Sequence, residues 1–197
     1  MTDTLNPIPS VIPARTRTGV PRPGAGVLRL RPTLRGRGFV VGAVDAAGPD
    51  TSGFAPRDRV AWRDDGRELP ALLLMPQDDV LGVPSWISDE QVVSYLAPGL
   101  VARALVRTRP VGRGDAVQVL ASDPLVHRMT SAWVKSLGAR VTDDDATLEI
   151  RDLPQARRIG GGHGRLAQAA VEVFQAIRAG VFDGVEPISG TRPGLAA

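Results

Sequence analysis

The chain has 197 residues, of which 43% are hydrophobic, so it is long enough to build one sizeable domain or two small ones around a buried core. It contains no cysteine, which excludes disulfides, thiolate nucleophiles and cysteine-bound zinc. The formal net charge is only +3 although the sequence pI is about 10.4, because nearly every base is arginine. This composition is more typical of a GC-rich genome than of a nucleic-acid-binding surface.

Residues 1–25 are rich in proline and lack a periodic apolar pattern, so we expect an extended N-terminal arm. No signal peptide is recognisable, and no apolar stretch approaches the roughly 20 residues that span a bilayer. These features predict a soluble cytoplasmic protein with no membrane partner and no nucleic-acid partner.

Short apolar segments alternate with turn signals from residue 26 onwards, for example at Gly48-Pro49-Asp50. Short strands at this spacing favour a small β-barrel or sandwich. The expected strands are residues 27–30, 39–44, 59–62 and 71–75.

A helix is expected after Ser88, because Ser88-Asp89-Glu90-Gln91 has the sequence of a capping box. Apolar residues at helical spacing continue to Leu105. Pro98-Gly99 interrupts this pattern, and the interruption predicts a kink or two abutting helices.

The later part of the chain has the pattern of a βαβ unit, which is the opening of a dinucleotide-binding fold. Its helix has Gly138 in the usual place of a C-terminal glycine. The expected elements are a strand at 117–121, a helix from Pro124 to about Leu137, a strand at 139–141, a strand at 147–150 and a helix at 165–179.

Three motifs in this order resemble those of the medium-chain dehydrogenase/reductase superfamily, most closely its zinc-free quinone oxidoreductases and enoyl reductases. Residues 53–60 are similar to the family turn G-F-x-P-G-D-R-V, with Arg57 in place of a glycine. Residues 83–105 resemble its P-x-x-x-S-x-E-x-A helix. Residues 114–141 resemble the G-D-x-V-L-V strand and the L-G-A-R-V strand of its nucleotide-binding half.

The resemblance implies an α/β protein. A GroES-like β-barrel domain with its following helices is expected at residues 26–112, and a reduced Rossmann-like βαβ domain at residues 113–197. Most of the later Rossmann strands of the family have no counterpart in the sequence, so the second domain is expected to be truncated.

The loop that holds the cofactor diphosphate in this family departs from its pattern here. The family carries A-A-x-G-G-V-G, whose glycines let a diphosphate reach a helix N-terminus, whereas residues 121–127 are Ala-Ser-Asp-Pro-Leu-Val-His. Asp123 followed by Pro124 is a sound helix start, but it places a negative charge where the diphosphate would dock. We therefore expect no nicotinamide cofactor. No metal is expected either, because the zinc ligands of the family are missing.

His127, Asp123 and Tyr95 are the candidates for general acid–base or hydrogen-bonding roles in the vacated cleft. The helix dipole would favour a neutral His127 on the first helical turn. The plainer alternatives are an exposed helix position for His127, a helix cap for Asp123 and packing for Tyr95. The second histidine, His163, lies in a glycine-rich segment that is more simply a linker.

The candidate substrate-binding residues follow from the resemblance. Val101 stands where the family has a threonine that faces the nicotinamide, and the cleft walls are expected to carry large apolar groups. The candidates are Trp62, Val101 and Leu125.

Three functions are compatible with these observations. The first is a cofactor-independent enzyme, such as a cyclase or isomerase acting on a hydrophobic, polyketide-like intermediate of natural-product biosynthesis. The second is a non-catalytic binding or scaffold protein. Such a protein could form a homodimer through the exposed edge of its shortened sheet. The third, least favoured, is a working NAD(P)H-dependent quinone or enoyl reductase.

Overall fold

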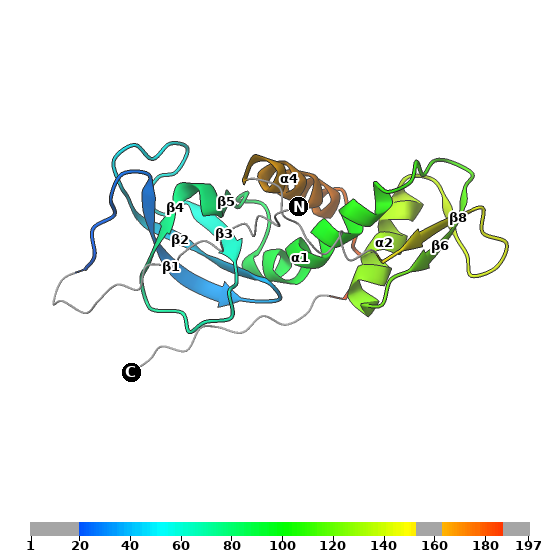
Figure 1. Cartoon of the computed structure of the whole chain (residues 1–197), viewed down its shortest axis with the longest axis horizontal. Coiled ribbons are helices and arrows are strands. Elements are labelled where there is room, and N and C mark those ends of the chain that lie inside the picture. Colours follow the sequence, from blue (N-terminus) through cyan, green and yellow to red (C-terminus); the bar gives the residue numbers. More distant parts are fainter. Residues whose placement is uncertain (1–19, 153–162, 187–197) are drawn as a thin grey trace, which may run out of the picture.

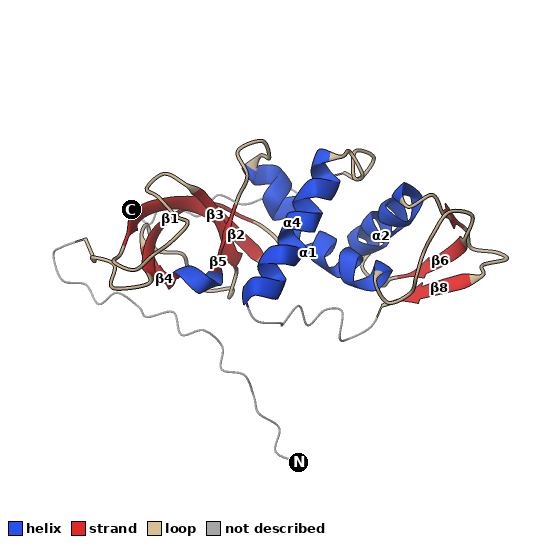
Figure 2. Cartoon of the chain, turned by 90° about the horizontal axis from the view of Figure 1, so that it is seen from above, coloured by secondary structure: helices blue, strands red, loops and turns tan. Residues whose placement is uncertain are grey.

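The computed structural model describes residues 20–152 and 163–186 (Figure 1). An antiparallel sheet lies at one end of the molecule and a smaller parallel sheet at the other, with helices between them (Figure 2). The expected α/β class is confirmed, as is the order of a GroES-like half-barrel followed by a reduced Rossmann-like part.

The antiparallel sheet has the strand order β4-β1-β2-β3-β5 and curls into an open half-barrel. All four expected strands are present, and the structure extends most of them. The fifth strand, β5, follows a short 3-10 helix and was not expected. The elements are β1 (Val27–Arg35), β2 (Phe39–Ala47), β3 (Arg59–Arg63), β4 (Leu73–Pro76), η1 (Gln77–Asp79) and β5 (Val80–Gly82).

One face of this sheet forms a closed apolar core of its own. Leu28 and Leu30 of β1 pack there with Val40 of β2 and Trp62 of β3, and all four side chains are almost fully buried. The alternation of apolar residues along each strand points these side chains to one side. Trp62 therefore lies inside the half-barrel core.

Helix α1 (Asp89–Val106) links the two halves and begins as expected. The Ser88 hydroxyl accepts from the Gln91 N–H, and the Gln91 side chain accepts from the Ser88 N–H. Helix α1 continues through Pro98 as one element, so the alternative of two abutting helices is wrong. Packing on several sides offsets the hydrogen bond that proline removes: Leu96 and Leu100 are buried in a shared core cluster.

The second half is a βαβ unit with one additional strand. Its three parallel strands have the order β7-β6-β8, and one crossover helix packs on them together with the C-terminal end of α1. Val117 and Val119 face that helix, whereas Gln118 and Glu149 lie on the opposite, exposed face of the sheet. The elements are β6 (Ala116–Leu120), α2 (Pro124–Ser136), β7 (Arg140–Val141) and β8 (Leu148–Arg151).

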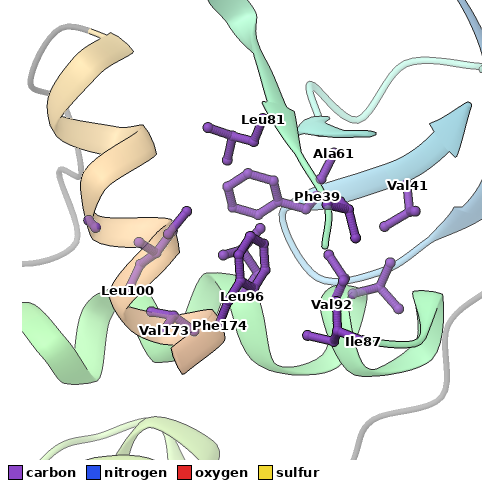
Figure 3. Packing of buried hydrophobic residues seen from close by; sticks show 14 of the residues in the cluster. Phe39, Val41, Ala61, Leu81, Ile87, Val92, Leu96, Leu100, Val173 and Phe174 are labelled. Atoms are coloured by element: carbon purple, nitrogen blue, oxygen red, sulfur yellow. The ribbon is translucent and has the colours of Figure 1, made fainter. Parts of the chain in front are cut away.

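The last described helix, α4 (His163–Arg178), returns to the half-barrel instead of covering the parallel sheet (Figures 1 and 2). Its Val173 and Phe174 pack into one cluster with Phe39 of β2 and Leu96 of α1 (Figure 3). This cluster joins strands and helices from both ends of the chain, so it holds the barrel and the helical layer as one body.

A charged clamp fixes α4 along α1. The Arg103 Nε and Nη2 atoms donate to the two Glu172 carboxylate oxygens at 2.6 and 2.8 Å, and Arg107 also reaches Glu172. The hydrogen bond from Arg103 holds the pKa of Glu172 below its ordinary value.

Replacing Glu172 with glutamine is therefore expected to lower the free energy of unfolding at neutral pH by about 1 kcal/mol, since the pair is partly exposed. Because the folded-state pKa lies below the unfolded one, this contribution is present above the unfolded pKa and is lost as the pH falls through the folded one. Urea titrations at neutral pH and at pH 3 measure it. Glu149→Gln is the control, because Glu149 forms an exposed ion pair with Arg151. An equal loss of stability in both variants would show that the Arg103–Glu172 pair adds no more than an exposed one.

Candidate functional site

A pocket of about 210 Å³ lies where the half-barrel, α1 and the parallel sheet meet. It opens at the carboxyl end of β6, whose two neighbours β7 and β8 lie on opposite sides. Open α/β sheets bind ligands at such a switch in strand order. The lining residues are Arg37, Gly38, Ala97, Pro98, Val101, Asp123, Val126 and Asp152.

Asp123 caps helix α2 at the edge of this pocket. Its Oδ1 atom accepts from the Leu125 N–H at 2.9 Å and from the Val126 N–H at 3.2 Å. Pro124, at the first helical position, has no N–H to donate. The helix N-terminus, where backbone N–H groups would otherwise meet an anion, is thus satisfied by the protein's own carboxylate.

Arg37 crosses from the half-barrel to the same carboxylate. It lies in the turn between β1 and β2, and its Nη1 atom is 2.9 Å from Asp123 Oδ2. Gly38 beside it has a φ of +76°, a conformation that glycine adopts without strain. Both oxygens of Asp123 are therefore engaged, one by the α2 backbone and one by a guanidinium from the other half of the molecule.

Of the six residues expected at the site, the structure brings Asp123 and Val101 together in the pocket wall. His127 is partly buried on the first turn of α2 but is not part of the lining. Leu125 is buried in a cluster with Met129 and Phe182, and Trp62 lies within the half-barrel core.

Tyr95 is buried and committed to a structural hydrogen bond. Its hydroxyl donates to the Val185 carbonyl at 2.6 Å, and its ring lies 6.1 Å from that of Phe182. Burial, together with the nearby Asp183, raises the pKa of Tyr95. The hydroxyl anchors the turn that follows α4 and is not directed at the pocket residues.

Sequence reasoning missed two polar residues of the pocket, Arg37 and Asp152. Asp152 follows β8, and its carboxylate accepts from the Ser122 hydroxyl at 2.8 Å. Both residues reach the site through long-range packing, so no local motif marks them. One signal could have indicated Asp152: residues that follow adjacent parallel strands meet at the same edge of a sheet.

The N-terminus of α2 is not free to hold the diphosphate of a nicotinamide cofactor. A dinucleotide diphosphate needs free N–H groups at a helix N-terminus, and here the N–H groups of Leu125 and Val126 already donate to Asp123. The Asp123 carboxylate would also face the incoming negative charge. These residues therefore do not fit a nicotinamide dinucleotide bound in the family's manner.

Two searches of the described residues gave negative results. No cluster of three or more histidine, aspartate or glutamate side chains suitable for a metal ion occurs within residues 20–152 and 163–186. None of the helices in those ranges is long and apolar enough to cross a membrane. His163 begins α4, but its side chain lies outside the described part of the structure.

The sequence matches no family model and no curated protein. The fold, however, is shared with solved structures. A mycobacterial quinone oxidoreductase superimposes with a TM-score of 0.61 at 18% identity, with 84% of each chain covered. A quinone oxidoreductase of Pseudomonas syringae superimposes with a TM-score of 0.61 at 13% identity, again with 84% of each chain covered.

A third structure is Escherichia coli quinone oxidoreductase complexed with NADPH. It gives a TM-score of 0.52 at 16% identity, and the alignment covers 80% of the present chain but 51% of that one. The alignment covers a smaller share of the Escherichia coli protein than of the present chain. This agrees with a small Rossmann-like half, in which the described residues form three strands and one crossover helix. The chain thus shares the fold of these quinone oxidoreductases, and it aligns with about half of the Escherichia coli protein.

Proposed function

We propose that this chain is a non-redox binding protein built on the reductase fold, and that its remaining cleft takes a small, largely apolar molecule. The observation that carries the proposal is the double engagement of Asp123, by the α2 N-terminus and by Arg37. A nicotinamide dinucleotide would have to displace both interactions. Without that cofactor, hydride transfer to a quinone or enoyl group has no electron source.

The pocket wall indicates the chemistry of the ligand. Ala97, Pro98 and Val101 of α1 and Val126 of α2 provide apolar lining, whereas Arg37, Asp123 and Asp152 provide the charged groups. A cavity of about 210 Å³ is below the usual range of drug-sized sites, so a compact molecule is favoured.

Binding is preferred over the cyclase or isomerase reading for a geometric reason. General acid–base catalysis needs a group within hydrogen-bond reach of the substrate. Tyr95 donates to Val185, and Asp123 is held by Arg37 and by the helix N-terminus. His127 is not in the pocket lining. A catalytic role would require Asp123 to leave both partners first.

The test uses menadione, a compact bicyclic quinone, as the probe, with calorimetry as the measurement. Saturable binding to the natural protein is expected. Val101→Phe fills the pocket wall and is expected to weaken binding at least tenfold. Val171→Phe, at an exposed position of α4, is the matched control and should bind as the natural protein does.

Two results would refute the proposal. One is the absence of menadione binding up to its solubility limit, and the other is equal affinity of Val101→Phe and Val171→Phe. Consumption of NADPH in the presence of menadione, followed by its absorbance at 340 nm, would instead support a working reductase.

A further inference from the structure

A second hollow, of about 300 Å³, lies on the half-barrel and shares no residue with the cleft pocket. Strands β1 and β2 and the turn before β3 surround it. Three of its six lining residues are apolar, and two of its three charged side chains are arginines. The lining residues are Arg31, Ala43, Val44, Asp45, Pro56 and Arg57.

The charge around this hollow is unbalanced. Asp45 Oδ2 is 2.6 Å from Arg29 Nε, and its Oδ1 is 2.8 Å from Arg31 Nη2, so one carboxylate serves two guanidinium groups. The Arg57 side chain is exposed and makes no ion pair with any residue in the described ranges. The neighbouring Asp58 carboxylate accepts from the Ala55 N–H.

Arg57 also has an unfavourable backbone conformation. Its φ is +77°, in the left-handed region that glycine adopts most easily. The turn is fixed by the Arg57 N–H, which donates to the Val44 carbonyl at 2.8 Å. Strained non-glycine residues persist only where the surrounding structure holds them, and they cluster at functional sites. At Arg57 the strain coincides with a guanidinium in the lining of the hollow.

We propose that this hollow binds the phosphoryl group of a small phosphomonoester, between Arg31 and Arg57. Guanidinium groups match phosphate oxygens in geometry and charge. Arg29, Arg31 and Arg57 outnumber Asp45 and Asp58 by one positive charge, and this excess favours an anionic group. Ala43 and Pro56 provide apolar surface for the rest of the ligand, whereas the Val44 side chain is buried in the half-barrel core.

The test exploits two opposite effects of one substitution. Arg57→Gly relieves the backbone strain, so the melting temperature without ligand is expected to rise by about 2–4 °C. The same variant loses one guanidinium, so its affinity for phenyl phosphate, measured by calorimetry at low salt, is expected to fall at least tenfold. Arg57→Lys keeps the charge and the strain but loses the forked guanidinium geometry, so its affinity should lie between those of the natural protein and Arg57→Gly.

Arg67→Gly is the control, because Arg67 is an exposed arginine outside the hollow and should leave phenyl phosphate binding unchanged. The proposal is overturned if Arg57→Gly binds phenyl phosphate as the natural protein does, or if the natural protein does not bind it at millimolar concentration. Tighter binding of a single-stranded oligonucleotide, at equal phosphate concentration, would also overturn it in favour of a nucleic-acid surface.

Discussion

Replacing Gly42 with alanine is expected to lower the free energy of unfolding by about 3 kcal/mol. Gly42 lies in the middle of the half-barrel, where β2 pairs with both β1 and β3. A Cβ atom there would be 2.3 Å from the Arg31 carbonyl oxygen and 2.9 Å from the Trp62 ring. The first contact is with backbone, so a paired strand has to shift to relieve it.

Urea denaturation followed by tryptophan fluorescence measures this effect. Gly82→Ala is the matched control, because Gly82 also lies in a strand of this sheet but a Cβ atom there meets open space. That variant should stay within about 0.5 kcal/mol of the natural protein. Equal losses in the two variants would show that the β1–β2 contact is not tight.

NADPH is expected to bind more weakly than 1 mM, which is at least a thousandfold weaker than micromolar binding. The diphosphate would lose the N–H groups of Leu125 and Val126, which donate to Asp123. It would also approach the Asp123 carboxylate, and two like charges 4 Å apart at an effective dielectric of 20 repel by about 4 kcal/mol. Calorimetric titration with NADPH and with NADH measures the affinity.

Asp123→Ala separates the effect of the Asp123 carboxylate on NADPH affinity from the effects of Pro124 and Leu125. The variant removes both the repulsion and the helix cap, and the lost cap is expected to cost about 1 kcal/mol of stability. NADPH affinity is expected to rise, but Pro124 still lacks an N–H and Leu125 is still bulky, so micromolar binding should not appear. Micromolar affinity in the unsubstituted protein would show that Asp123 moves aside at little cost.

The elements that could be predicted from sequence are those with local causes. The capping box at Ser88 and the Asp123-Pro124 helix start are encoded within a few residues, and both appear as expected. The βαβ order follows from apolar runs and from Gly138, whose φ of +85° ends α2. Pro98 does not divide the helix in two, because packing around α1 outweighs the local breaking signal.

The parts that could not be predicted depend on contacts between distant segments. Arg37 meets Asp123 only because the β1–β2 turn and the α2 N-terminus converge beside α1. The Tyr95 hydroxyl meets the Val185 carbonyl for a similar reason, since the chain after α4 folds back on α1. A single sequence contains the residue types but not these pairings.

We infer that the N-terminus of α2 is closed to a diphosphate by the protein's own carboxylate. The backbone N–H resonances of Leu125 and Val126, followed by NMR during addition of NADPH, test it most directly. Because both groups donate to Asp123, their chemical shifts are predicted to stay unchanged up to millimolar NADPH. A saturable shift of both resonances with a micromolar midpoint would contradict the claim.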